Sequence, residues 1–150
     1  AHRPALQALA RALGLVPLHL PSPMPAQARA AYHAAANLAA SGVLAVLAEA
    51  GALWSAAGLE GDQLLAALLP LARGALDTAA ARGLPGAVSG PIARGDAGVL
   101  ARHLDALAGS GLDVDLLCAL GLRQLALAQA AGRLDVAQVT ALRALLAASS

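Results

Sequence analysis

The hydrophobic and polar positions of this chain follow a helical spacing over most of its length. A stretch without proline, 26–57, is built mainly from Ala and Leu, which are strong helix formers. It predicts one long helix, with Ser41 and Gly42 as the place where the helix would bend. Because its small side chains let other helices approach closely, we expect the remaining elements to pack around it.

Apolar residues three and four positions apart predict further helices in the rest of the chain. These helices cover 4–13, 63–81, 97–108, 113–131 and 136–148. Glycines that should end the helices before them are Gly14, Gly58, Gly83 and Gly132. Aspartates that should begin the helices after them are Asp62, Asp96, Asp113 and Asp135.

Two proline-containing segments interrupt this pattern. Pro70 falls inside 63–81 and should kink that helix or break it for one turn. The segment 84–95, LPGAVSGPIARG, combines Gly with Pro and is expected to be largely non-helical.

The first residues have a different character from the rest. The segment 16–20, VPLHL, is expected to form a strand that the PSPMP turn closes. One helix and one strand cannot form a sheet alone, so 1–22 should be the tail of an α/β domain and 23–150 a helical domain. The predicted fold is an all-α multi-helix bundle around one long central helix, with this short helix–strand remnant at its N-terminus.

Composition supports packed helices and excludes several kinds of function. Hydrophobic residues make up 59% of the chain and charged residues 13%, which excludes a disordered chain. All ten basic residues are Arg, so lysine Schiff-base chemistry is excluded. The net charge of +1 without a basic stripe argues against nucleic acid as a partner. Cys118 is the single cysteine and is expected to be an inert core thiol in a cytoplasmic protein.

The high apolar content raises the question of a membrane. The uncharged run 30–48 is long enough to cross a bilayer. It contains Tyr32, His33, Asn37 and Ser41, however, and Ala is only weakly lipophilic. We therefore expect no membrane association, and the first residues show no secretion signal.

A few polar residues stand out as candidates for chemistry. His33 and Asn37 are one helical turn apart, so an imidazole acid or base and an orienting amide would share one face. Arg94 lies in the Gly/Pro-rich segment 84–95 and could bind an anion through both of its terminal nitrogens. Tyr32, Ser89 and Asp96 accompany them in the sequence.

Each candidate also has a purely structural interpretation. His33 and Asn37 could be packing residues, Arg94 could brace its loop, and Ser89 could close a turn. Asp96 is expected above all to be an N-cap and His103 to be an exposed helix residue. His19 could lie on either face of its strand and is not expected to be a ligand. The sequence has no metal-binding spacing, no Gly-x-Ser-x-Gly, no P-loop and no Gly-x-Gly-x-x-Gly.

Several of these residues together resemble a known family. The run YHAAA from Tyr32, the pair Pro70-Leu71, the run SGPIARGD from Ser89 and then His103 resemble the DUF2520 family in order and spacing. The resemblance covers about 26–127. Two positions depart from the family pattern: Ser41-Gly42 stands where Ser-Asn is usual, and Ser89 stands where Thr is common.

The resemblance implies a function that spacing alone does not. In that family the helical domain follows a Rossmann-like dinucleotide-binding domain, as in the 6-phosphogluconate dehydrogenase, hydroxyacid dehydrogenase and pyrroline-carboxylate reductase group. It implies an NADP- or NAD-dependent oxidoreductase for a small anionic substrate, with this part building the substrate side of the cleft and a homodimer interface. A chain without the glycine-rich loop should bind nicotinamide cofactors poorly and be inactive alone.

The resemblance also assigns roles to individual residues. His33 and Asn37 would be catalytic, because the hydroxyacid dehydrogenases place a Lys and an Asn one turn apart on the equivalent helix. The residues expected to bind substrate are Tyr32, Ser89, Gly90, Pro91, Arg94 and Asp96. The alternative is a helical interaction or scaffold module without an active site.

Overall fold

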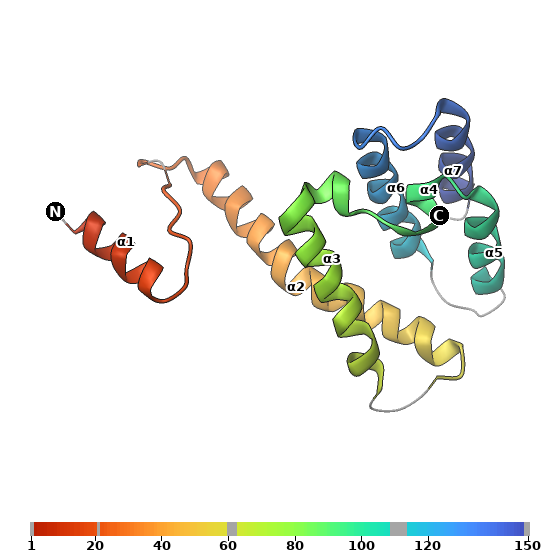
Figure 1. The fold of residues 1–150 in the computed structure, drawn as a ribbon, viewed down its shortest axis with the longest axis horizontal. Helices are drawn as coiled ribbons and strands as arrows, with labels where there is room; N and C mark the ends of the chain where they lie inside the picture. Colours follow the sequence, from red (N-terminus) through yellow and green to blue (C-terminus); the bar gives the residue numbers. More distant parts are fainter. Residues whose placement is uncertain (1, 21, 60–62, 109–113, 149–150) are drawn as a thin grey trace. The chain divides into compact units, whose positions relative to one another are not determined.

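The protein is described here by a computed structural model that covers residues 2–20, 22–59, 63–108 and 114–148. Its helices, drawn in Figure 1, are α1 (Arg3–Ala12), α2 (Ala26–Ala56), α3 (Gln63–Ala87), α4 (Gly90–Arg94), α5 (Ala97–Ala108), α6 (Asp115–Ala130) and α7 (Val136–Ala148). None of the described residues lies in a strand. The expected all-α, multi-helix class is therefore confirmed.

The chain divides into two compact units, 1–46 and 47–150, with the boundary inside α2. The first unit contains α1, an irregular segment and the beginning of α2. The second contains the end of α2 and all of α3–α7. We expected 1–22 to be the tail of an α/β domain and 23–150 to be a helical domain. That division of the chain stays a prediction.

The predicted strand at 16–20 is wrong for this chain. These residues have no regular structure, and Val16 and Leu18 are 84% and 74% exposed. The reason is physical: the amide and carbonyl groups of a strand need a neighbouring strand, and the described residues offer none. The guanidinium of Arg3 in α1 instead contacts the imidazole of His19 across this segment.

Three predicted glycine stops are confirmed by their backbone geometry. Gly14, Gly58 and Gly132 have φ values of 72°, 75° and 66°, the left-handed conformation in which a side chain is unfavourable. After each of them, the next residue donates its N–H back to a carbonyl of the last helical turn, at 2.8, 3.2 and 3.2 Å respectively. This arrangement satisfies carbonyl groups that the end of a helix leaves unpaired.

Two predicted aspartate caps are also confirmed. The Asp96 carboxylate accepts a hydrogen bond from the Val99 N–H at 3.0 Å, and Asp135 accepts one from the Gln138 N–H at 2.8 Å. Gln138 returns the interaction, because its side-chain oxygen accepts the Asp135 N–H at 3.0 Å and completes a capping box. The predicted caps Asp62 and Asp113 lie outside the described residues.

The two proline segments differ from the expectation. The helix α3 runs through Pro70 without a break and is interrupted only at Gly83, where φ and ψ are 72° and 164°. Residues 84–87 and 90–94, which we expected to be non-helical, form short helical turns. Pro85 and Pro91 begin these turns, which is physically favourable because a first-turn residue needs no N–H partner and proline already has a helical φ.

The hydrophobic core of the second unit lies among α4, α5, α6 and α7. Its buried members are Ile92, Leu100, Leu104, Cys118, Leu125, Leu142 and Leu146. At Gly121 in α6 an added Cβ would lie 2.6 Å from the Cδ2 atom of Leu146 in α7. These two helices therefore pack closely at a position where only hydrogen fits, and Cys118 is buried in this core, as expected.

The core is consequently not built around the long helix as we predicted. Among the described residues of α2 only Gly51 is buried, where an added Cβ would lie 2.9 Å from the Leu64 Cδ2 atom of α3. The apolar residues of α2 are spread around the helix, and a helix of that kind needs covering on more than one side. The shorter α5 instead concentrates Leu100 and Leu104 on one face, which suits a compact core.

Two helices have the length and apolar composition of membrane spans. By length and composition, α2 and α3 are apolar enough to cross a bilayer. The core helix of a soluble protein has the same length and composition, but such a helix is mostly buried, whereas 6% of the apolar window of α2 and 0% of that of α3 are buried. The expected absence of membrane association remains a prediction.

Candidate functional site

The SGPIARGD run forms a tight corner between α3 and α5, and most of its residues have a structural role. Ile92 and Ala93 are buried in the core. Gly95 ends α4 with φ 72°, and a Cβ there would lie 2.2 Å from the Gln138 side-chain nitrogen. Asp96 caps α5. Four of the eight residues are thus explained by the fold alone.

Two polar side chains of the corner have no such role. Ser89 occupies the N-cap position of α4, yet its hydroxyl makes no capping hydrogen bond. Arg94 is exposed, and it is its backbone carbonyl, not its guanidinium, that accepts a hydrogen bond from Gln138 at 3.5 Å. These exposed polar groups are free to meet a ligand. Gly90, with φ 87°, and Pro91 shape the backbone between them.

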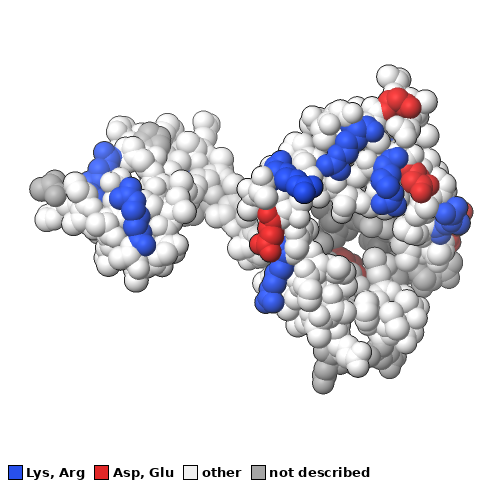
Figure 2. Space-filling view, in the orientation of Figure 1, with Lys and Arg blue, Asp and Glu red and all other residues white. Residues whose placement is uncertain are grey.

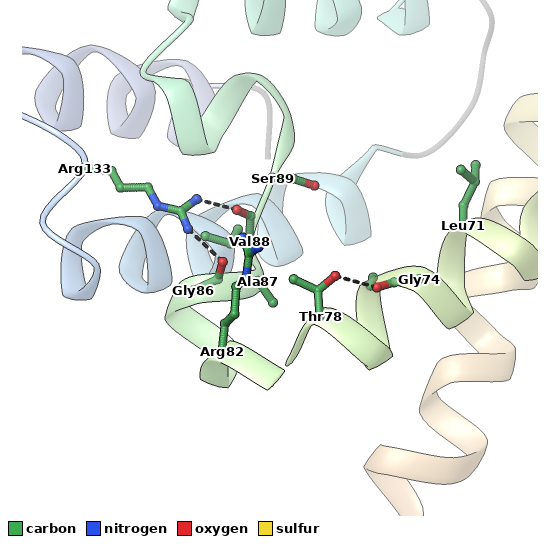
Figure 3. A pocket seen from close by; sticks show the side chains of 10 residues that line it. Leu71, Gly74, Thr78, Arg82, Gly86, Ala87, Val88, Ser89 and Arg133 are labelled. Carbon is green, nitrogen blue, oxygen red and sulfur yellow. Dashed lines mark hydrogen bonds between the residues drawn. The ribbon is translucent and has the colours of Figure 1, made fainter. Parts of the chain in front are cut away.

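A pocket of about 640 Å³ lies directly beside Ser89, within the second unit. Its walls come from α3, from the segment that leads to Ser89 and from the turn between α6 and α7, as Figure 3 shows. The lining residues are Leu71, Gly74, Ala75, Thr78, Arg82, Gly86, Ala87, Val88, Ser89 and Arg133. Of the predicted site residues in this unit, Ser89 lines the pocket, whereas Gly90, Pro91, Arg94 and Asp96 do not.

One wall of the pocket is held in place by Arg133. Its Nη1 donates to the Val88 carbonyl at 2.6 Å, and its Nη2 donates to the Gly86 carbonyl at 2.9 Å (Figure 3). These two carbonyls are not bonded within a continuous helix, because the helical pattern stops there. Arg133 therefore fixes the backbone that presents Ser89.

The electrostatic character of the pocket is positive. Among the residues that the structure describes, Arg82 and Arg133 line it, and no Asp or Glu does. The Thr78 hydroxyl donates to the Gly74 carbonyl at 2.7 Å, so its oxygen remains available as an acceptor. On the face drawn in Figure 2 the arginines form separate patches, and some have an acidic residue beside them. On this face, therefore, the basic residues do not form a continuous surface.

The other predicted site residues lie on α2 in the first unit. The rings of Tyr32 and His33 meet edge to face, with centroids 5.4 Å apart and planes at 64°. Both side chains are exposed, and Asn37 is exposed one turn further along the helix. The helical spacing of His33 and Asn37 is as predicted. Their convergence with Arg94, which belongs to the second unit, stays a prediction.

Sequence reasoning missed three polar residues of the pocket: Thr78, Arg82 and Arg133. A signal was present for the two arginines, because Arg82 precedes Gly83 and Arg133 follows Gly132. Glycines that end helices place the adjacent side chains at element junctions, where pockets form. His103, by contrast, is exposed on α5 and lines no part of the pocket. Among the described residues, no group of three His, Cys, Asp or Glu is placed to hold a metal ion.

Comparison with known proteins gives one match. Residues 1–123 match the model of a family described as "Domain of unknown function (DUF2520)". The matched range includes α1 and the irregular segment after it, which lie before the stretch whose motifs resembled this family. No curated protein and no solved structure matches the chain.

Proposed function

The chain belongs to the DUF2520 family, and from this membership we propose that it is the substrate-side and dimerisation part of an NAD(P)-dependent oxidoreductase. The substrate would be a small anion. The protein would act in the cytoplasm, together with a Rossmann-like domain that holds the nucleotide.

One observation carries the proposal more than any other. In the corner that contains the family motif, the side chains of Ser89 and Arg94 are the polar groups that the fold does not use. Ser89 also lines the pocket, and exposed polar residues without a structural role are candidates for binding a substrate. A corner that served only to join two helices would not need them.

The proposed roles follow the chemistry of each side chain. His33 is the acid or base, since one ring nitrogen of an imidazole can accept a proton and the other can donate one. Asn37, one turn away on α2, orients the reacting group through its amide, and Tyr32 supports the His33 ring by the edge-to-face contact. Arg94 binds the anionic group of the substrate, and Ser89 donates a hydrogen bond to it.

The residues of this chain do not fit a nicotinamide nucleotide by themselves. The sequence contains no Gly-x-Gly-x-x-Gly loop, whose glycines let a backbone approach the pyrophosphate. Nucleotide binding is therefore assigned to the Rossmann-like domain, and no residue of this chain is given a role in it.

Titration with NADPH, followed by nicotinamide fluorescence, tests this division of labour. We expect tight binding to the complete gene product and none to these 150 residues. In the complete protein, His33→Gln should lower turnover by about 10²-fold or more while NADPH still binds, because general acid–base catalysis contributes on that scale. A tight NADPH complex with this chain alone, or an active His33→Gln variant, would contradict the proposal.

A scaffold without an active site is the second candidate, and the exposure of α2 favours it. Leu38 and Leu44 are 74% and 67% exposed, so this helix offers apolar surface for association. Both candidates predict a homodimer, which light scattering would detect. They differ at His33 and Arg94: in a scaffold, replacing either residue would leave every activity of the complete protein unchanged.

A further inference from the structure

Within the described part of the chain, the pocket beside Ser89 is lined by two guanidinium groups and by no carboxylate. We propose that this pocket binds an organic acid, whose anionic head, a carboxylate or a phosphate, lies between Arg82 and Arg133 and whose body is apolar. This anion site is separate from Arg94, which does not line the pocket, so the proposal goes beyond the proposed function and rests on it only in calling the ligand a substrate.

Arg133 is already held in the position that an anion needs. Its two hydrogen bonds, to the carbonyls of Val88 and Gly86, fix the plane of the guanidinium. The group has more N–H donors than these two carbonyls occupy, so others remain for a ligand. A side chain that is fixed before binding loses less conformational entropy when the ligand arrives.

Arg82 contributes a second charge that nothing in the described structure neutralises. Its guanidinium makes no hydrogen bond or ion pair with any other described residue, although its stem is closely placed. A Cβ at Gly86 would lie 2.8 Å from the Arg82 Cβ, so the glycine is what lets this stem pass the pocket wall. The Arg82 guanidinium is thus a positive charge at the pocket that no described residue pairs with, and an anion site needs such a charge.

The rest of the pocket suits the apolar body of such a ligand. Leu71 and Val88 line it together with small alanine side chains, and Leu71 is 70% exposed in the absence of a ligand. The volume of about 640 Å³ is within the range of about 300–1,000 Å³ that small-molecule sites occupy. Ser89 lies on the same lining and adds a polar group to it.

The test uses the whole 150-residue chain, without nicotinamide cofactor, and three probes of equal chain length: octanoate, octyl phosphate and octan-1-ol. Binding is followed by the amide chemical shifts of the pocket residues. We expect at least one anion to bind with an apparent Kd of about 1 mM or tighter and octan-1-ol to bind about tenfold more weakly. The tighter anion identifies the head group.

Two variants locate the binding. Arg82→Gln removes the unpaired charge and should weaken anion binding about tenfold. Arg73→Gln, on the same helix but outside the pocket, is the matched control and should leave binding unchanged. Ala75→Leu keeps both arginines and should also reduce binding, because the larger side chain occupies the space of the apolar body.

Several outcomes would overturn the proposal. One is that octan-1-ol and both anions bind equally tightly. Another is that an Arg82→Gln variant keeps its native spectrum and binds the anions as tightly as the parent chain. A third is that the probes change the amide chemical shifts only outside the pocket. Failure here is separable from failure of the proposed function. Octanoate binding without NADPH-dependent turnover in the complete protein would support the anion pocket and reject the oxidoreductase. NADPH-dependent turnover without binding of either anion in the pocket would reject the pocket and support the oxidoreductase.

Discussion

Two regions of this chain have similar apolar composition and opposite exposure to solvent. In α6 and α7, Leu125, Leu142 and Leu146 expose 1% of their surface or less. In α2, Leu38 and Leu44 expose 74% and 67%. Residue type therefore does not decide burial in this protein.

Apolar residues are spread around α2, α6 and α7 to a similar degree, so the difference lies in which neighbours pack against each helix. The helices α4–α7 are short, and glycines such as Gly121 let them approach one another until leucine side chains interdigitate. Among the described residues of the long helix α2 only Gly51 is buried, at its contact with Leu64 of α3, so most of its apolar residues stay exposed. The comparison teaches that α4–α7 bury their apolar residues against one another, whereas α2 presents apolar surface on which a partner could pack.

Replacing a buried leucine should give the largest effect. Leu142→Ala removes a side chain with no exposed surface and leaves a cavity among α5, α6 and α7. We expect the free energy of unfolding to fall by about 2–5 kcal/mol. Urea unfolding followed by far-ultraviolet circular dichroism measures it.

Leu44→Ala is the matched control in the long helix. Its side chain is mostly exposed, so the free energy of unfolding at low protein concentration should change by less than about 0.5 kcal/mol. If α2 carries the dimer interface, the same variant should weaken association in light scattering at high concentration. If the two substitutions lower the free energy of unfolding equally, then Leu44 contributes to stability as much as Leu142 does. The contrast between an open α2 and a packed core would then be contradicted.

The corner at Gly95 should be the next most sensitive point. Gly95→Ala places a methyl group in a left-handed backbone conformation and within 2.2 Å of the Gln138 side-chain nitrogen. We expect a loss of about 1–3 kcal/mol in the free energy of unfolding. Thermal unfolding of the single and double variants, the latter with Gln138→Ala, separates the two causes.

The double variant should recover only part of the loss. Removing Gln138 relieves the steric conflict but leaves the backbone strain and also removes half of the capping box with Asp135. Complete recovery would mean that the positive φ at Gly95 costs nothing, contrary to the account of the corner given above.

The fold was predictable where local chemistry decides it. Helix type, the glycine stops at Gly14, Gly58 and Gly132, and the caps at Asp96 and Asp135 all depend on neighbours within one turn. The strand at 16–20 was mispredicted because an alternating pattern reports a strand only when a partner strand exists. The continuation of α3 beyond Gly83 was missed because Pro85 can begin a helical turn as readily as end one.

The candidate site was less predictable for a similar reason. Ser89 was found from its motif, and its place on the pocket follows from the corner that the motif forms. Arg133 lies more than forty residues away in the sequence and reaches the carbonyls of Gly86 and Val88 only through the packing of α6 against the earlier helices. No periodicity within a single helix reports such a contact.

A substitution at Asp96 tests whether this residue serves the fold or the substrate. Asp96→Ala should cost about 1 kcal/mol in the free energy of unfolding, because the Val99 N–H loses its acceptor. Asp96→Asn should cost little, since asparagine is an equally good N-cap. If the carboxylate also binds substrate, the Asn variant of the complete protein will be stable and yet impaired in turnover, whereas a purely structural Asp96 leaves turnover intact.

Apart from the control variants, the smallest expected effect is a gain in stability, and it returns to the contrast between packed and open helices. At Gly74 in α3 an added Cβ meets no atom within 4 Å, and the residue has an ordinary helical backbone. Gly74→Ala should therefore raise the free energy of unfolding by about 0.5–1 kcal/mol, because alanine restricts the unfolded chain and favours the helix. Thermal unfolding measures the gain.

The same substitution at Gly121 is the control that makes this result informative. There the new methyl group would lie 2.6 Å from the Leu146 Cδ2 atom, so Gly121→Ala should destabilise the protein although the intrinsic helix preference is identical. Opposite signs at the two glycines would show that helix propensity governs the open side of α3 and that packing governs α6. Stabilisation at both would mean that α6 and α7 can move apart without cost, and the core would then be looser than its buried leucines indicate.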